Sequence, residues 1–307
     1  MNKTGIAKKN MTNRQKDQIF AFFCVLPVFL GLSIVVFAPI IKAIWMSFME
    51  YRINSAKVPV WNHFQNYTSL LQFGALWEYL KNTLVFIIGV VSIQFVIAMG
   101  VALLLNTGIR GGKIFRSIFM IPWTIPSVVT ALLWSWLLQP QYGVLNFLSY
   151  SAGLQNQMNV LWTQDPKLAM ISIIIASVWR QTPYMMLMLL AGLQSVDSAL
   201  LEAARIDGGN PWQVFLHVII PSIRPVIDTT LVVAVINNSQ MFTIIYNMTK
   251  GGPMSKTTTF AIAAYNKAFV EFDFGAGSAL GVIWLVILGV SVFLYKRYSD
   301  RHVSSYM

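Results

Sequence analysis

Residues 194–221 read QSVDSALLEAARIDGGNPWQVFLHVIIP, a polar and charged segment between long apolar stretches. Asp197 or Ser198 can begin a helix here, because their side chains accept hydrogen bonds from the free N–H groups of a first helical turn. Ala, Leu and Glu, which favour helix, continue it through Arg205. The segment therefore predicts a short helix that is too polar to cross a membrane.

The same segment carries signals for a turn and a second helix. Gly208 and Gly209 end the first helix, since glycine adopts the left-handed conformation without strain. Asn210 and Pro211 then occupy the capping and first positions of a new helix, which we expect Pro221 to end. The pattern predicts a helix–turn–helix on one face of the molecule.

Apolar stretches surround this segment, and each is long enough to cross a bilayer, which takes about 20 helical residues. The chain has 307 residues, 56% of them hydrophobic and 11% charged, whereas soluble domains carry about 25% charged residues. Runs such as 85–88 do not alternate, which excludes transmembrane strands. The sequence thus predicts an all-α polytopic membrane protein with six transmembrane helices. These are 19–41, 83–105, 117–139, 168–193, 225–247 and 275–295.

The distribution of basic residues predicts the orientation. If the N-terminus is cytoplasmic, the inside segments hold 13 Lys or Arg in 72 residues and the outside segments hold 8 in 96. This excess has the sign that the positive-inside rule requires. We expect cytoplasmic tails at 1–18 and 296–307, a first helix with its external loop at 19–82, and a core at 83–295. The loop 194–224 within this core is then cytoplasmic.

Several other classes of protein are excluded or disfavoured. Cys24 is the only cysteine, so the chain is no disulfide scaffold. The net charge of +11 comes from basic residues beside apolar stretches, which indicates topology rather than nucleic-acid binding. Gly111-Gly112-Lys113-Ile114 is not a phosphate-binding loop. No paired catalytic groups and no metal-ligand spacing occur, so we expect no enzyme activity, no metal site and no cofactor on this chain.

A short, alanine-rich helix also suits docking into a groove of another protein. The residues alone leave an ordinary interfacial loop open as the alternative. The combination Glu202-Ala203-Ala204, Asp207-Gly208 and Val218-Ile219-Ile220-Pro221 resembles the EAA loop of ABC-importer permeases. In that family the loop precedes the last two helices, as it does here. The position usually filled by Ala in the family is Gly209 in this chain.

This resemblance implies a type I ABC-importer permease bundle with cytoplasmic coupling helices, in a bacterial cell membrane. It implies that a separate ABC ATPase dimer binds ATP and Mg²⁺ and docks on the loop. A second, non-identical permease subunit and an extracytoplasmic sugar-binding protein are the other implied partners. The residues that the resemblance assigns to ATPase coupling are Glu202, Ala203, Ala204, Arg205, Asp207 and Gly208.

A second set of motifs narrows the resemblance. The run 249–253 (TKGGP) and the segment 265–280 look like those of sugar-importer permeases of the maltose and glycerol-3-phosphate type. Within that group, the Gly-Gly-Pro turn resembles the turn found in the first of two non-identical permease subunits. The runs 179–184 (WRQTPY) and 142–146 (YGVLN) also resemble sequences of these sugar-importer permeases. The implied substrate is a carbohydrate, and an oligosaccharide in particular.

Uncharged polar groups within spans are candidates for a solute pathway, because they cost free energy if they face lipid. Amides can donate to and accept from sugar hydroxyls, and aromatic rings can cover the C–H face of a sugar. Interhelical hydrogen bonding and packing are the alternative roles. We expect Arg180 to cap carbonyls that a kink at Pro183 frees. The candidates for the pathway are Asn237, Asn238, Gln240, Gln94, Trp134 and Tyr184.

Two alternative functions remain at this point. An ABC permease could carry a non-sugar solute such as a glycerophosphate or a polyol. A secondary transporter would need ion-coupling carboxylates within the spans, and only Asp228, near one end of a span, qualifies.

Overall fold

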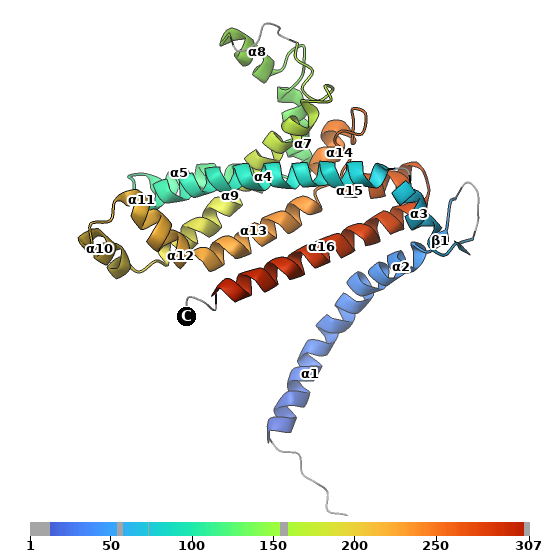
Figure 1. The fold of residues 1–307 in the computed structure, drawn as a ribbon, viewed down its shortest axis with the longest axis horizontal. Coiled ribbons are helices and arrows are strands. Elements are labelled where there is room, and N and C mark those ends of the chain that lie inside the picture. Colours follow the sequence, from blue (N-terminus) through green and yellow to red (C-terminus); the bar gives the residue numbers. More distant parts are fainter. Residues whose placement is uncertain (1–12, 54–57, 73, 154–158, 304–307) are drawn as a thin grey trace, which may run out of the picture.

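A computed structural model describes residues 13–53, 58–72, 74–153 and 159–303. Parts of the two expected tails, 1–12 and 304–307, therefore lie outside the described residues. The described chain consists mainly of helices, with a bundle of long helices at its centre (Figure 1).

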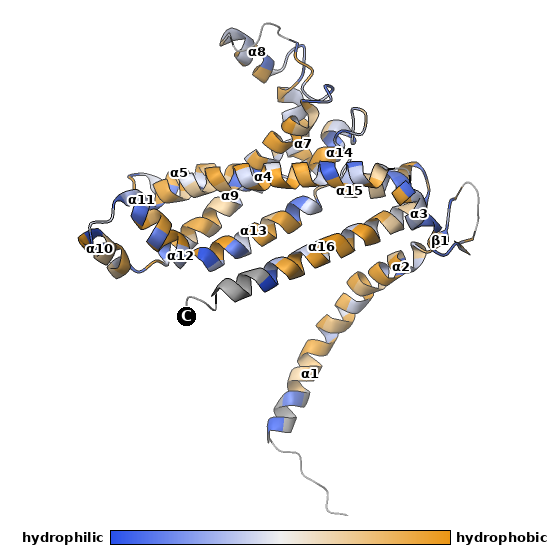
Figure 2. Cartoon of the chain, in the orientation of Figure 1, coloured by the Kyte–Doolittle hydropathy of each residue, from blue (hydrophilic) through white to orange (hydrophobic). Residues whose placement is uncertain are grey.

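Four helical segments are long and apolar enough to cross a membrane. The first is made of α1 (Asn13–Leu32), the π-helical turn η1 (Ser33–Phe37) and α2 (Ala38–Met46). The others are α4 (Ala75–Asn106), α9 (Ala169–Gln194) and α16 (Phe274–Val303). Apolar residues run along the length of α1, α4 and α16 (Figure 2). These segments correspond to the first, second, fourth and sixth expected spans.

Two further pairs of bent helices pass the same test of length and hydropathy, and the described residues contain six spans if each pair is counted as one span. In the first pair the helices meet at 94°, and in the second at 71°. The first pair joins α5 (Gly112–Phe119) and α6 (Ile121–Thr124) to α7 (Ser127–Leu137). The second joins α11 (Pro211–Val214), η2 (Phe215–Ile219) and α12 (Ile220–Ser222) to α13 (Arg224–Ser239).

The expectation of one continuous helix over 117–139 is wrong. Ile125 has extended backbone angles, φ −73° and ψ 130°, and it separates α6 from α7. The cause is Pro126, because the ring of a proline disfavours the helical conformation of the preceding residue.

The expected helix 225–247 is interrupted as well. α13 ends at Ser239, and α14 (Thr243–Thr249) begins after Phe242. The indole N–H of Trp284 on α16 donates to the carbonyl of Ser239 at 3.1 Å. A bond from a neighbouring helix thus satisfies a carbonyl at the end of α13. Nearby short polar side chains also compete for backbone groups, which favours an interruption here.

The core lies where α4 and α9 pack side by side, where α13 and α15 (Phe260–Tyr265) pack on them, and where α16 packs on α13 and α15. Phe86, Ile173 and Leu189 are fully buried between the long helices. Phe260 stacks on Trp284 with ring centroids 4.8 Å apart. The remaining short elements are β1 (Met49–Glu50), β2 (Val60–Trp61), α3 (Gln65–Gln72), α8 (Val144–Ser151) and the π-helical turn η3 (Asn266–Val270). β1 and β2 pair antiparallel, with Met49 opposite Trp61.

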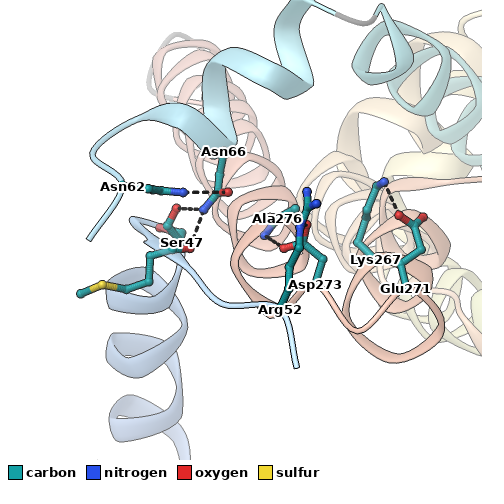
Figure 3. A network of polar contacts seen from close by, with 9 residues as sticks. Ser47, Arg52, Asn62, Asn66, Lys267, Glu271, Asp273 and Ala276 are labelled. Carbon is teal, nitrogen blue, oxygen red and sulfur yellow. Dashed lines mark hydrogen bonds and ion pairs between the residues drawn. The ribbon is translucent and has the colours of Figure 1, made fainter. Parts of the chain in front are cut away.

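The first helix diverges from the bundle along α1, whereas α2 packs against α16 (Figure 1). There the Nδ2 of Asn66 donates to the carbonyls of Ser47 and Met49, at 2.8 and 2.9 Å. The guanidinium of Arg52 pairs with Asp273 at 2.7 Å, just before α16 (Figure 3). Gly275 permits this approach, because a Cβ there would lie 2.2 Å from the carbonyl oxygen of Met49.

Candidate functional site

The polar segment after α9 forms the short helix that its sequence predicts. This helix is α10 (Ser198–Ile206), and Asp197 caps it by accepting a hydrogen bond from the N–H of Ala199 at 2.9 Å. Of the two expected caps, Asp197 is therefore the one used. The helix ends in a turn at Gly208, whose φ of +82° lies in the region that favours glycine.

The second helix starts where Asn210 and Pro211 predict it. Asn210 and Gln213 form a capping box, in which each backbone N–H donates to the other residue's side-chain oxygen at 2.9 Å. Gly209 lets the two helices approach, since a Cβ on it would lie 2.8 Å from the carbonyl oxygen of Ala204. Sequence reasoning missed Gln213, although its position three residues after the cap is a recognisable signal.

The residues that the resemblance assigns to coupling lie at one end of the bundle, on and after α10 (Figure 1). Ala204 is partly buried, and the other five are exposed. Neither Glu202 nor Arg205 forms an ion pair or side-chain hydrogen bond with a described residue. Two large apolar side chains beside them, Ile206 and Trp212, are 85% and 66% exposed. Sequence reasoning did not include these two in the docking surface.

The expectation that Pro221 ends the second helix is wrong. The π-helical turn η2 and α12 carry the helix through Pro221 to Ser222. Pro221 has no N–H to continue the helical hydrogen bonds, and it directly follows the π-helical turn η2, where the α-helical pattern has already changed. The break falls at Ile223, and α13 follows directly. The docking segment is therefore continuous with a long helix of the bundle.

A cavity of about 240 Å³ lies between α4, α6, α9 and α13. Three of the six pathway candidates line it, namely Gln94, Tyr184 and Asn237. The Tyr184 ring stacks on Trp123, with ring centroids 5.7 Å apart and an interplanar angle of 19°. The remaining lining residues are Trp123, Arg180, Gln181, Met185, Thr230, Ala234 and Met241.

The other three candidates lie elsewhere. Trp134 lines a separate apolar pocket and packs against Trp179 with ring centroids 6.0 Å apart. Asn238 is buried, and its side chain donates to the carbonyl of Ala234. Gln240 is exposed at the C-terminal end of α13. The structure thus divides a run of adjacent polar residues, since only Asn237 of this run faces the cavity.

Buried amides join three helices at the base of the cavity. The Nε2 of Gln94 donates to the carbonyl of Gln181 at 3.2 Å, and the Nε2 of Gln181 donates to Oδ1 of Asn238 at 2.9 Å. The Oε1 of Gln94 is buried and accepts no hydrogen bond from a described residue. Gln181 was missed as a candidate, although it lies in the WRQTPY run.

Arg180 has the capping role that its sequence predicts, but for a different carbonyl. Its Nε donates to the carbonyl of Ile125 at 3.2 Å, at the break between α6 and α7. The freed carbonyl therefore results from Pro126 on a neighbouring span and not from the kink at Pro183. Arg180 is also one of the residues that line the cavity.

Comparisons with known proteins find relatives that cover most of this chain. A probable ABC transporter permease of Pyrococcus horikoshii is 32% identical over 94% of this chain and 98% of its own. The trehalose/maltose transport system permease MalF of Thermococcus litoralis is 30% identical over 94% and 97%.

A solved structure shares the fold. It is the structure of a bacterial ABC transporter involved in the import of the acidic polysaccharide alginate. One chain of that transporter superposes on this chain with a TM-score of 0.79 and 23% sequence identity. The superposition covers 93% of this chain and 96% of the transporter chain. Residues 94–305 match a family described as the inner membrane component of binding-protein-dependent transport systems. The protein is thus a membrane permease component and belongs to this family.

Proposed function

We propose that the chain is the membrane-spanning permease subunit of an ATP-driven carbohydrate importer. It would form the translocation pathway with a second, non-identical permease subunit. An ABC ATPase dimer would bind ATP and Mg²⁺ on the cytoplasmic side, and a sugar-binding protein would deliver the substrate from outside. The relative from Thermococcus litoralis, which is named for trehalose and maltose, supports a carbohydrate as the substrate.

The observation that carries this proposal is the continuity between the docking segment and the cavity wall. α10 and α11 lead through η2 and α12 directly into α13. α13 in turn supplies Thr230, Ala234 and Asn237 to the cavity. A displacement of α10 by a partner would therefore move residues that line the proposed pathway.

The mechanism that follows is alternating access. The bundle has an outward-facing and an inward-facing state, and a ligand shifts the balance only by binding one state better than the other. ATP on the partner ATPases and the loaded binding protein would both favour the outward-facing state. Because the two effects act on one equilibrium, each would strengthen the other.

Uptake by the reconstituted importer tests the coupling surface. We expect Glu202→Lys to reduce ATP-driven uptake at least about tenfold, since reversing an interface charge places like charges together. Gly208→Trp would have the same effect, because a side chain at a φ of +82° strains the turn. Both variants would still insert into the membrane.

The matched control is Glu271→Lys, which reverses an exposed carboxylate that pairs with Lys267 just before α16. It would leave uptake near the wild-type rate. Normal uptake by both coupling variants would contradict the docking assignment. Sugar uptake driven by a proton or sodium gradient in the absence of ATP would instead indicate a secondary transporter.

A further inference from the structure

The cavity has an unusual charge for a site inside a membrane bundle. Arg180 is the only charged residue among those that line it, and no Asp or Glu lines it. Arg180 also forms no ion pair with any described carboxylate. Cations at this depth normally pair with a carboxylate or with backbone carbonyls, because they are costly there. The cavity therefore has a net positive charge.

The guanidinium of Arg180 is held in place and only partly used. Its Nε donates to the carbonyl of Ile125, which fixes the plane of the group. The two Nη groups donate to no described residue. These two groups form the fork that binds carboxylate, sulfonate or phosphate oxygens through paired hydrogen bonds.

Neutral groups beside the arginine favour a carbohydrate over a simple inorganic anion. The amide of Asn237 and the hydroxyl of Tyr184 form no side-chain hydrogen bond with a described residue. An amide and a phenol each donate and accept, as sugar hydroxyls require. The Tyr184–Trp123 stack adds an apolar surface. An inorganic anion would leave most of these groups unused.

We propose that the carried carbohydrate bears an anionic group, such as a carboxylate, which Arg180 binds in this cavity. This inference rests on the proposed function, which supplies the carbohydrate. The anion neutralises the only charge in the cavity, while Asn237 and Tyr184 bind neighbouring hydroxyls. Arg180 thus selects acidic over neutral sugars and also ties α9 to the break between α6 and α7.

The test compares two ligands with the same sugar rings, one carrying carboxylates and the other uncharged methyl esters. Labelled tri-galacturonate and its methyl ester would be dialysed to equilibrium against the complete importer in nanodiscs, without binding protein. We expect the methyl ester to bind about tenfold more weakly, because it cannot form charge-assisted hydrogen bonds. High salt would weaken the binding of the acid and leave that of the ester unchanged.

Variants assign the preference to one residue. Arg180→Gln would bind both ligands equally weakly, whereas Arg180→Lys would retain part of the preference because it keeps the charge. Equal binding of the two ligands to the wild-type importer would overturn the inference, and would mean that another subunit neutralises Arg180. Uptake of neutral sugar alone would also overturn it. Failure to take up any carbohydrate with ATP and binding protein would instead overturn the proposed function.

Discussion

Asn146 shows how a single side chain shapes the loop between α7 and α9. It is 1% exposed, and its Nδ2 contacts three backbone carbonyls at 3.1–3.3 Å. Its Oδ1 accepts a hydrogen bond from the indole of Trp162 at 2.6 Å. One amide therefore connects both ends of the loop that contains α8.

Removing this amide should loosen the loop. Asn146→Ala leaves the N–H of the partly buried Trp162 and several carbonyls without partners, so we expect it to lower the free energy of unfolding by about 2 kcal/mol. A denaturant titration in detergent measures this loss. Asn247→Ala is the matched control, because that exposed amide donates only to the carbonyl of Thr243. An equal loss in both variants would contradict the role given to Asn146.

Residues with local partners were the ones that could be predicted from sequence. Asp197 and Asn210 cap helices through bonds to groups two or three residues away, so their spacing alone is informative. The partners of Asn146 lie up to 16 residues away and meet only once the loop has folded. The same limit applied to Arg180, whose partner is 55 residues distant.

At the level of elements, the first helix depends on a small anchor. No residue in its apolar window is buried. The contacts that hold its C-terminal end include those of Asp273. This carboxylate pairs with Arg52 and also caps α16 by accepting a hydrogen bond from the N–H of Ala276 at 2.9 Å. The position of the first helix should thus respond to changes in this carboxylate.

Cys24, the only cysteine, permits a direct measurement because it is exposed on α1. Spin labels on Cys24 and on a Ser291→Cys variant would report the distance from α1 to α16. We expect Asp273→Ala to broaden the distance distribution and to cost about 2 kcal/mol, through loss of the cap and the ion pair. Asp273→Asn keeps a capping oxygen and should have the smaller effect.

The comparison for this experiment is Lys267→Gln. It breaks the exposed pair with Glu271 within one short helical segment, a type of pair worth at most about 0.5 kcal/mol. The distance distribution should stay as in the wild type. A distribution that Asp273→Ala leaves unchanged would show that other contacts hold the first helix.

Hydropathy predicted where apolar helices occur but not how they break. Composition alone located all six apolar stretches, because a helix that crosses a bilayer needs about 20 predominantly apolar residues. The break after Ser239 has a local signal in its short polar side chains, but the bond that satisfies the Ser239 carbonyl comes from Trp284, a residue 45 positions away. The break at Ile125 has a local cause in Pro126, but proline is often tolerated in membrane helices and its effect is therefore ambiguous.

For the whole molecule, the two ends of the bundle differ in what they present. α5 and α10 lie at one end, whereas α3 and β1 lie at the other (Figure 1). The end with α5 carries Arg110, Lys113 and Arg116 close to the membrane-spanning helices. From the positive-inside rule we therefore expect α10 to lie on the cytoplasmic side and α3 outside.

Two serine-to-cysteine variants test this orientation in cells, each in a Cys24→Ser background. Ser69 on α3 and Ser198 on α10 are both exposed. We expect a membrane-impermeant maleimide to label Ser69→Cys in intact cells, and to label Ser198→Cys only after the membrane is permeabilised. Equal labelling of both variants after permeabilisation is the control for access. Labelling of Ser198→Cys in intact cells would invert the topology and would separate α10 from any cytoplasmic ATPase, so this result would contradict both the orientation and the coupling mechanism.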